Sequence, residues 1–452
     1  MTRAAEAFGA FIKNKKIAVI GAGISNSPLV KLFFDHGCSS VTVRDKKIVS
    51  DENAAYFRSL GAEVICGEDY LDDLFADIVI RTPGLRPDVP ALNKTRDNGA
   101  IVIGETQLFL KFAPCRVIGV TGSDGKTTTT TLISMILKAS GKKVHLGGNI
   151  GVPLLPMIDS IGEDDFACME LSSFQLMDGE YSPDISVITN LSQNHLDWHK
   201  DMNEYALAKT NIFTHQNSDG LVILNADDQY SPRFAALAPG KVEYFSVKHP
   251  VSEGAWLENG RLIYKGVPMV DSADVKIPGI FNRANYLAAI CAVGDICDRN
   301  AVIDIAKTFG GVEHRCEWIR NISGVDYYNS SIDSSPARTL ATLSAFDKKL
   351  TIICGGYDKH LDYDVLKAPF FDKVKKVYAA GQTAPRIIAA LSDENAPYTL
   401  KRCENIKEAL DLAYTEAQSG DTVILSPASA SFDAFKNFEE RGRYFKDLVR
   451  NL

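Results

Sequence analysis

The sequence of 452 residues lacks the features of several protein classes. No apolar run approaches the roughly 18 residues of a membrane span, and the first residues lack a signal-peptide core. The nine cysteines are scattered, without Cys-x-x-Cys pairs or zinc-type spacing, which favours idle thiols in a reducing compartment. Basic residues form no block, and 49 Lys and Arg stand against 57 Asp and Glu, for a net charge of −8. We therefore expect a cytoplasmic protein with no membrane span and no nucleic-acid surface.

Strand patterns alternate with helical patterns in three successive blocks, which is typical of parallel α/β layers. The sequence therefore predicts three α/β domains. They are a Rossmann-like domain over residues 1–104, a central P-loop mononucleotide-binding domain over 105–311 and a Rossmann-like domain over 312–452. The boundaries rest on soft signals near residues 104 and 311.

The most informative segment is the turn TGSDGKT at 121–127, between an apolar run and an amphipathic stretch. Its two glycines allow backbone N–H groups to point at phosphate oxygens. Lys126 can reach the outer phosphates, and the Thr127 hydroxyl can hold Mg²⁺. The full eight-residue P-loop pattern fails because Val120 stands at its first glycine. A plain Gly-rich turn is the alternative, but the flanking strand and helix favour nucleotide binding.

The first block contains most of a dinucleotide-binding fingerprint. GAGISN at 21–26 follows the apolar strand pattern at 16–20, and Asp45 lies about twenty residues on. Asn26 stands where the third glycine would pack the helix, so the fingerprint is weak evidence for NAD. It remains consistent with a diphosphate at a helix N-terminus. Asp45 could accept from a sugar or base, or it could be a solvated acid at a strand end.

The second block places polar residues after apolar runs, where open parallel sheets bind ligands. Glu170 ends the run at 166–169 and could be a second Mg²⁺ contact. His195 follows the run at 185–189, although a lone histidine is more often structural. From its own neighbourhood, Lys209 looks like an ordinary lysine on a helix surface. A third layer is indicated by further runs that end in turns near residues 355, 381 and 426.

Six motifs between residues 122 and 315 resemble those of the Mur ligase family. They are GSDGKT at 122–127, GNIG at 148–151, ELSSFQ at 170–175, NLSQNH at 190–195, NRAN at 282–285 and EHR at 313–315. Within that family, the first block and the run at 426–442 resemble the members that add D-glutamate.

The resemblance implies an ATP-dependent ligase that joins D-glutamate to UDP-N-acetylmuramoyl-L-alanine in peptidoglycan precursor synthesis. Such enzymes phosphorylate a carboxylate, and the amine then attacks the acyl phosphate with release of ADP and phosphate. ATP, two Mg²⁺ sites and a monomeric, cytoplasmic enzyme are the associated expectations.

The family pattern also assigns roles to individual residues. It implies that Lys126, His195 and Lys209 are catalytic, and that metal is held by Thr127, Glu170, His195 and Lys209, the last as a carbamate. ATP contacts are expected at Gly122, Ser123, Asp124, Gly125, Lys126, Thr127, Thr128, Asn282, Asn285 and Arg315. The UDP substrate is expected at Ile24, Ser25, Asp45, Lys46, Thr82, Gly84, Asn149, Ser172 and Gln175, and D-glutamate at Lys359, Ser431 and Phe438. Core packing is the plain alternative for Phe438.

Several positions depart from the family pattern. Asp124 stands where Asn is frequent, Phe281 where His is common, and Asn194 where an acid is common. Ser330 and Ile332 replace the Asp and Lys of the usual Asn-Asp-Ser-Lys motif. We expect Ser330 still to lie at the ATP site, with Asp333 supplying the missing carboxylate.

Three other functions compete with this interpretation. The first is a non-catalytic nucleotide-binding paralogue, which the departures around the adenosine motivate. The second is a Mur-type ligase for another amino acid. The third is a simple P-loop kinase, which would leave the third domain unexplained.

Overall fold

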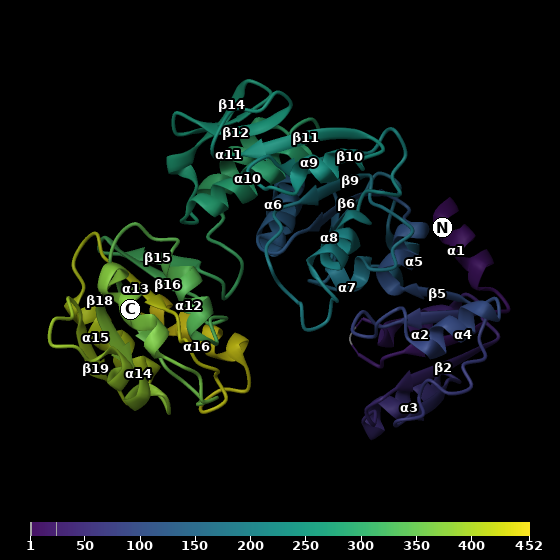
Figure 1. Cartoon of the computed structure of the whole chain (residues 1–452), viewed down its shortest axis with the longest axis horizontal. Coiled ribbons are helices and arrows are strands. Elements are labelled where there is room, and N and C mark those ends of the chain that lie inside the picture. The colour runs from purple at the N-terminus through teal and green to yellow at the C-terminus, as the bar shows by residue number, and fades with distance from the viewer. Residues whose placement is uncertain (1, 24) are drawn as a thin grey trace. The chain divides into compact units, whose positions relative to one another are not determined.

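The chain is built on three β-sheets, and the computed structural model describes residues 2–23 and 25–452 (Figure 1). It forms two compact units, one of residues 1–270 with 284–305 and one of residues 271–283 with 306–452. The α/β class is confirmed. The predicted boundaries at 104 and 311 remain predictions.

The first sheet contains five parallel strands in the order β3-β2-β1-β4-β5. Its central strand is buried and apolar beyond Lys16, so the chain leaves the middle of the sheet at Gly21. Its elements are α1 (Arg3–Ile12), β1 (Lys16–Ile20), α2 (Ser27–Asp35), β2 (Ser40–Asp45), α3 (Asp51–Ser59), β3 (Glu63–Cys66), β4 (Ile78–Arg81), α4 (Pro90–Asp97) and β5 (Ile101–Gly104).

The second sheet contains nine strands in the order β14-β13-β12-β11-β10-β9-β6-β8-β7. From β7 to β12 each neighbouring pair is parallel, and β12 pairs with β13 antiparallel. The elements up to β10 are α5 (Glu105–Lys111), β6 (Arg116–Thr121), α6 (Lys126–Ala139), β7 (Val144–Gly148), η1 (Leu155–Ser160), β8 (Phe166–Glu170), α7 (Ser173–Leu176), β9 (Ile185–Ile188), α8 (Met202–Thr210) and β10 (Leu221–Asn225). The remaining ones are α9 (Ser231–Ala235), β11 (Lys241–Ser246), β12 (Gly254–Glu258), β13 (Arg261–Tyr264), β14 (Val267–Asp271), η2 (Ser272–Asp274), α10 (Ile280–Val293) and α11 (Arg299–Thr308).

The third sheet contains six strands in the order β15-β16-β20-β17-β18-β19, and only the pairing of β15 with β16 is antiparallel among its described pairs. The last strand of the chain therefore lies inside this sheet. Its elements are β15 (Glu317–Ile322), β16 (Val325–Asn329), α12 (Pro336–Leu343), β17 (Leu350–Cys354), η3 (Asp364–Leu366), α13 (Lys367–Lys373), β18 (Val374–Ala379), α14 (Ala384–Leu391), β19 (Thr399–Arg402), α15 (Ile406–Glu416), β20 (Thr422–Leu425) and α16 (Phe438–Arg450).

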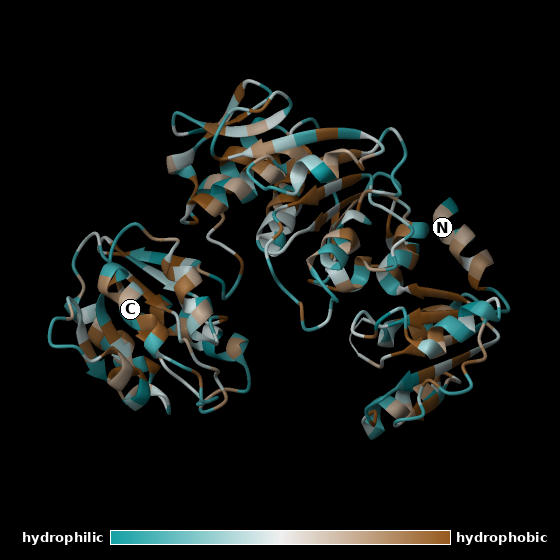
Figure 2. Cartoon of the chain, in the orientation of Figure 1, coloured by the Kyte–Doolittle hydropathy of each residue, from teal (hydrophilic) through white to brown (hydrophobic). Residues whose placement is uncertain are grey.

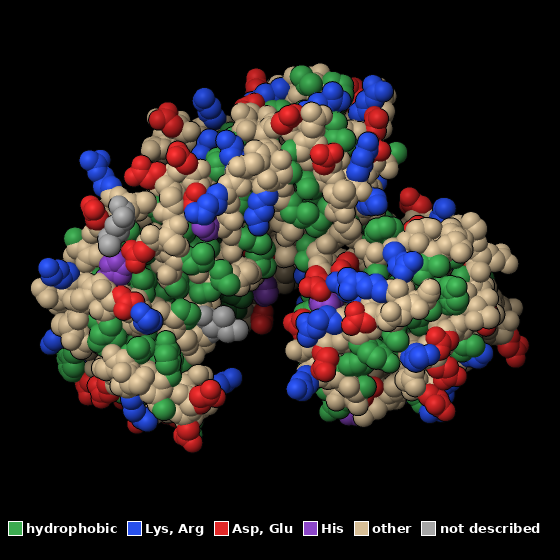
Figure 3. Space-filling view, turned by 180° about the vertical axis from the view of Figure 1, so that it is seen from behind, with side chains coloured by type: hydrophobic (Ala, Val, Ile, Leu, Met, Phe, Trp, Pro, Cys, Tyr) green, Lys and Arg blue, Asp and Glu red, His purple; other side chains and the backbone are tan. Residues whose placement is uncertain are grey.

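Hydropathy follows these layers. Hydrophobic residues concentrate on the strands and on the helix faces that pack on them, while loops are mainly hydrophilic (Figure 2). On the face shown in Figure 3, acidic and basic side chains are interspersed. Among the described helices, none combines the length and apolar character needed to cross a membrane.

Candidate active site

The phosphate-binding turn joins β6 to α6, as predicted. Gly122 has φ +148°, and a Cβ there would lie 1.9 Å from Thr189 Oγ1. Gly125 has φ +79°, and a Cβ there would lie 2.3 Å from Asn285 Oδ1. Both positions therefore require glycine, for backbone conformation and for space.

Two lysines converge on this turn. Lys126 Nζ donates to Gly122 O at 3.0 Å and to Ser123 O at 2.9 Å. Lys209 Nζ, from α8, donates to the same Gly122 O at 2.8 Å and to Thr121 Oγ1 at 3.2 Å. Sharing one carbonyl brings the two side-chain nitrogens together at the N-terminus of α6, where the helix end and the Lys126 ammonium suit a polyanion.

Lys209 is buried, although its neighbours in the sequence predict an exposed lysine. It is 1 % exposed, so the ordinary surface lysine suggested by its neighbours is wrong. Burial lowers the pKa of Lys209 well below its usual value, and the nearby Lys126 acts in the same direction. Its ammonium lies 4.7 Å from the ring centre of Tyr205, one turn earlier on α8. A buried lysine with a lowered pKa is readily converted to a neutral amine.

Glu170 lies at the end of β8 and faces the turn. Its carboxylate accepts from Thr127 Oγ1 at 2.6 Å and from Asn149 Nδ2 at 2.7 Å, and the residue is 2 % exposed. A hydroxyl and a carboxylate at this separation are oxygen ligands of the kind that Mg²⁺ prefers. The pair fits one metal ion beside the phosphates.

No group of three or more His, Cys, Asp or Glu side chains suited to a metal occurs among residues 2–23 and 25–452.

The loop after β9 braces the turn. Thr189 Oγ1 donates to Asp124 O at 2.5 Å, and Asn190 Oδ1 accepts from Asp124 N at 2.9 Å. Ser123 Oγ contacts both Ser192 O and Tyr205 OH at 3.0 Å. Part of the motif at 190–195 thus fixes the shape of the turn, and Asp124 keeps its carboxylate exposed beside it.

His195 occupies the end of this loop with φ +54° and an exposed side chain. Its ring meets Phe174 edge-on at 4.9 Å. Desolvation lowers the pKa of His195, and the cations Lys126 and Lys209 act in the same direction. A neutral imidazole suits a metal ligand.

Asn285 and Thr128 complete the predicted ATP residues in this unit. Thr129 Oγ1 donates to Asn285 Oδ1 at 3.3 Å. This asparagine of α10 therefore packs against the first turn of α6. Thr128 is buried in the same turn of the helix.

In the first sheet, Asp45 organises the turn after β1. Its carboxylate accepts from Ala22 N at 2.9 Å and from Lys47 N at 2.8 Å. Ser25 is exposed at this turn, and Lys46 forms an exposed ion pair with Glu68. The predicted Ile24 lies outside the described residues.

Thr82 and Gly84 lie in the turn after β4. A Cβ on Gly21 would come 2.9 Å from Thr82 Cβ, so the turns after β1 and β4 lie side by side. Gly84 is exposed, and nothing lies within 4 Å of where its Cβ would be.

Ser172 and Gln175 begin helix α7. Ser172 Oγ accepts from Gln175 N, and Gln175 Oε1 accepts from Ser172 N at 2.9 Å, which is a capping box. Gln175 also donates to Thr106 Oγ1 at 3.0 Å, so its amide is anchored, not free to swing.

The second unit holds the remaining predicted ATP residues. Arg315 is exposed, and Asn282 Nδ2 donates to Pro278 O at 2.6 Å. Ser330 is fully buried, and Asp333 is 3 % exposed and accepts from Ser426 Oγ at 2.7 Å. Burial raises the pKa of Asp333 to about 6.

The predicted D-glutamate residues lie in the same unit. Lys359 is exposed, with its ammonium 5.2 Å from the ring centre of Phe432. Ser431 is 3 % exposed. Phe438, the first residue of α16, is partly buried and accepts from Ser331 Oγ through its carbonyl at 2.8 Å.

Sequence reasoning missed Arg441, which joins the loops around these residues. The side chain is 1 % exposed and donates to the carbonyls of Ser429, Ala430 and Ser331 at 2.8–3.0 Å. Burial lowers its pKa to about 10. A buried Arg in a run that otherwise reads as a polar helix surface gives little sequence signal.

Sequence reasoning also missed Arg81 and His199. Arg81 is 1 % exposed, pairs with Asp178 and donates to Leu85 O at 2.6 Å, which fixes the turn at 82–85. His199 is 2 % exposed and shares a hydrogen bond of 2.9 Å with Ser173 Oγ. The spacing of His199 four residues after His195 was the available signal.

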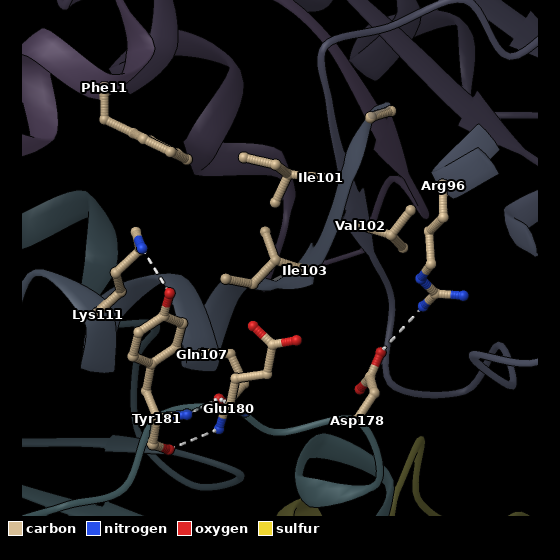
Figure 4. A pocket seen from close by; sticks show the side chains of 11 residues that line it. Phe11, Arg96, Ile101, Val102, Ile103, Gln107, Lys111, Asp178, Glu180 and Tyr181 are labelled. Carbon is tan, nitrogen blue, oxygen red and sulfur yellow. Dashed lines mark hydrogen bonds and ion pairs between the residues drawn. The ribbon is translucent and has the colours of Figure 1, made fainter. Parts of the chain in front are cut away.

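A cavity of about 270 Å³ lies where β5, α5 and the loop at 178–181 meet. Its walls combine apolar side chains with Lys111, Glu180 and the Arg96–Asp178 pair (Figure 4). None of the predicted site residues lines it.

Comparison with known proteins agrees with this geometry. The family model "Mur ligase middle domain" matches residues 120–293, and "Mur ligase, glutamate ligase domain" matches residues 314–429. The UDP-N-acetylmuramoylalanine–D-glutamate ligase of Acetivibrio thermocellus is 45% identical over 454 residues, covering 98% of this chain and 97% of the relative. The ligase of the same name from Clostridium kluyveri is 43% identical over 459 residues, covering 100% of both.

Solved structures support the fold. The UDP-N-acetylmuramate-alanine ligase of Thermotoga maritima matches with a TM-score of 0.57 at 21% identity, covering 97% of this chain and 99% of that one. A UDP-N-acetylmuramoyl-L-alanyl-D-glutamate–2,6-diaminopimelate ligase gives 0.58 at 17% identity, covering 96% and 92%. Given the match of both family models and the full-length identity to the curated ligases, the chain belongs to the Mur ligase family.

Proposed function

We propose that this protein is an ATP-dependent ligase that joins D-glutamate to UDP-N-acetylmuramoyl-L-alanine, a step of peptidoglycan precursor synthesis. Relatives that carry this activity in their names are 43–45% identical over nearly the whole chain. The observation that carries the proposal is the convergence of Lys126 and Lys209 on Gly122 O, beside the Thr127–Glu170 pair. This arrangement suits phosphoryl transfer to a carboxylate.

The first step transfers the γ-phosphoryl group of ATP to the carboxylate of the L-alanyl substrate. A carboxylate oxygen attacks phosphorus, the bond to the β-phosphate oxygen breaks, and ADP leaves. Lys126 neutralises charge on the transferring group, and backbone N–H groups of the turn hold the phosphates. Bound Mg²⁺, held by Thr127 and Glu170, would supply further charge neutralisation.

The second step forms the amide bond. The neutral amine of D-glutamate attacks the acyl carbon, phosphate leaves, and the amine loses a proton. Lys359, Ser431 and Phe438 orient the D-glutamate, and Arg315, Asn282 and Asn285 hold ATP. Ser330 and Asp333 belong to the ATP site in this proposal, although both are deeply buried.

We include carbamylation of Lys209 in the proposal. Its neutral amine attacks carbon dioxide and loses a proton, which turns a buried cation into an anion that can ligate metal. The low pKa of Lys209 favours the amine form that this reaction needs. The carbamate and His195 would then hold a second metal.

The nucleotide-sugar is assigned to the first sheet. Asp45 is the last residue of β2 and Lys46 follows it, Ser25 lies in the turn after β1, and Thr82 and Gly84 form the adjacent turn. Ile24 is included in the assignment. Asn149, Ser172 and Gln175 lie near Glu170 and would contact the substrate close to its reacting carboxylate. The domain roles, the three domain boundaries, the monomeric state and the cytoplasmic location are also parts of this proposal.

Phosphate release from ATP and Mg²⁺ in the presence of UDP-N-acetylmuramoyl-L-alanine tests the proposal. D-glutamate should support release, whereas L-glutamate, D-aspartate, L-lysine and no amino acid should not. Release with another amino acid would keep the ligase chemistry and overturn the substrate. No release despite ATP binding would favour the non-catalytic paralogue, and removal of Mg²⁺ with EDTA should abolish any release.

A further inference from the structure

Arg86 joins the first sheet to helix α8 of the second. It lies in the loop after β4, two residues past Gly84, and its side chain is 22% exposed. All five of its guanidinium N–H groups donate. The acceptors are Asp88 Oδ1 and Oδ2, Glu204 Oε1 and Oε2, and Trp198 O, at 2.8–3.2 Å.

Glu204 is the partner of Arg86 on α8. Its two oxygens accept from Arg86 at 3.0 and 3.2 Å, and its side chain is 19% exposed. It also accepts from Lys200 N at 2.8 Å, while its own N–H donates to Asp201 Oδ1 at 2.8 Å. Glu204 therefore fixes the N-terminus of the helix that carries Lys209, and the fork-to-fork geometry fixes an orientation as well as a distance.

His199 fills the space between this pair and the phosphate-binding turn. Its Nδ1 lies 3.5 Å from Glu204 Oε2, and its Nε2 shares a hydrogen bond with Ser173 Oγ. Its ring stacks on Phe174 and meets Tyr205 edge-on at 5.2 Å. Tyr205 in turn reaches Ser123 Oγ in the turn.

These contacts form a continuous path. It runs from the turn at 82–84 through Arg86 and Glu204 to α8, and so to Tyr205 and Lys209. Trp198 closes its open side, with the Arg86 guanidinium 5.0 Å from its ring centre. Because the groups are packed and mostly shielded from solvent, the path can hold a position more firmly than a surface ion pair.

We propose that Arg86 is a positioning residue that couples occupancy of the nucleotide-sugar turn to the placement of Lys209. The inference rests on the proposed function, since the turn at 82–84 is assigned there to the nucleotide-sugar. When the sugar nucleotide occupies that turn, contact with the turn further restrains Arg86, and the Arg86–Glu204 pair holds α8 in register with the turn at 121–127. Arg86 touches no substrate and acts through the helix.

The test uses Arg86→Met, Glu204→Gln and the double variant of the full chain. The matched control is Arg58→Met, an exposed arginine in the last turn of α3. Arg86→Met should raise KM for the nucleotide-sugar and lower kcat, each by about tenfold, while KM for ATP changes less than about twofold. Glu204→Gln should show the same changes in kcat and in KM for the nucleotide-sugar. The double variant should have the same kcat and KM as Arg86→Met, because both substitutions break one interaction.

Arg86→Lys keeps the positive charge but cannot form the two parallel hydrogen bonds to Glu204. Compared with Arg86→Met, it should restore less than half of the kcat that was lost. If the effects of Arg86→Met and Glu204→Gln multiply, or if kcat stays at the wild-type value, the coupling is refuted. Should Arg86→Met fail to fold, Arg86→Lys and Glu204→Gln carry the same readouts.

Hydrogen exchange separates this inference from the proposed function. Addition of UDP-N-acetylmuramoyl-L-alanine alone should slow amide exchange over residues 202–210 in the wild type and in Arg58→Met, but not in Arg86→Met. If the wild type releases no phosphate yet shows this protection, the coupling stands and the proposed reaction fails. Equal protection in the wild type and Arg86→Met would refute the coupling, whatever the activity.

Discussion

The chain contains two turns of similar design that hold different chemistry. The turn after β1 and the turn after β6 each follow a buried strand in the interior of a sheet and precede a helix, with a positive-φ glycine at Gly21 and at Gly122. The first is held by a carboxylate, since Asp45 accepts from Ala22 N. The second is approached by the side-chain nitrogens of two lysines, Lys126 and Lys209.

The two turns share a strand–turn–helix backbone but present different side chains to the same edge of their sheets. A turn held by an acid suits recognition of sugar or base hydroxyl and N–H groups near a diphosphate. A turn held by lysines and faced by Glu170 suits charge that develops during phosphoryl transfer. Substitutions in the two turns should therefore impair activity in different ways.

Lys126→Met should have the largest effect. Because Lys126 offsets charge on the transferring phosphoryl group, kcat should fall by about 10³-fold, with little change in KM for the nucleotide-sugar. Steady-state phosphate release measures both constants. Lys138→Met, at the far end of α6, is the matched control. If kcat of Lys126→Met falls by less than about tenfold, the turn after β6 does not have the role in phosphoryl transfer that separates it from the turn after β1.

Lys209→Met should lower kcat by about 10²-fold, since the proposed carbamate ligand would be lost. Depleting dissolved carbon dioxide should reversibly lower wild-type activity and leave the variant unaffected. If depletion changes nothing in the wild type, the carbamate is refuted and Lys209 acts as an amine or ammonium.

The same variant tests the stability of the second turn. The pKa of Lys209 is lowered on folding, so between its folded and unfolded values the unfolded chain binds the proton more tightly. For uncarbamylated protein, the free energy of unfolding should therefore rise with pH through that interval, towards the unfolded value of 10.5. Chemical denaturation of Lys209→Met should show a smaller slope against pH, and an unchanged slope would contradict the burial of a titrating lysine.

Asp45→Ala addresses the first turn. Loss of an acceptor for two backbone N–H groups should lower the free energy of unfolding by about 1–2 kcal/mol. KM for the nucleotide-sugar should rise about tenfold while kcat changes less than about twofold. Asp69→Ala, exposed in the same sheet's loops, is the control. A fall in kcat with unchanged KM would mean that the first turn also takes part in chemistry.

Gly23→Ala should have the smallest effect. Nothing lies within 4 Å of where its Cβ would be, so the free energy of unfolding should change by less than about 0.5 kcal/mol. KM for the nucleotide-sugar should still rise about threefold, because a methyl group would keep a diphosphate away from the backbone. The same change at Gly122, where the Cβ meets Thr189 Oγ1, should instead destabilise the fold. An unchanged KM for Gly23→Ala would place the diphosphate elsewhere.

Much of the fold was predictable from the sequence because the strands are short apolar runs that end in turns. The runs at 117–120 and 350–354, for example, are buried strands of parallel sheets. Periodicity and turn residues are local signals, so they identify elements well. They do not place β20 between β16 and β17, since that depends on contacts between distant segments.

The site was predictable where a motif is local, as in the turn at 122–127. Burial of Lys209 was not, because it depends on the strand β6 that lies more than eighty residues earlier. The same holds for Arg86, whose partner Glu204 lies 118 residues away, and for Arg441, which reaches back 110 residues to Ser331. From its sequence neighbours alone, each of these three side chains would be predicted to be a charged group exposed to solvent.

The position of β20 bears on how the chain is made. This strand is synthesised after every other described strand of the sheet, yet it pairs with β16 on one side and β17 on the other. During synthesis, the two halves of the third sheet therefore keep unpaired edges until residues 422–425 are made. Truncation before residue 422 would remove the middle of this sheet and not its margin.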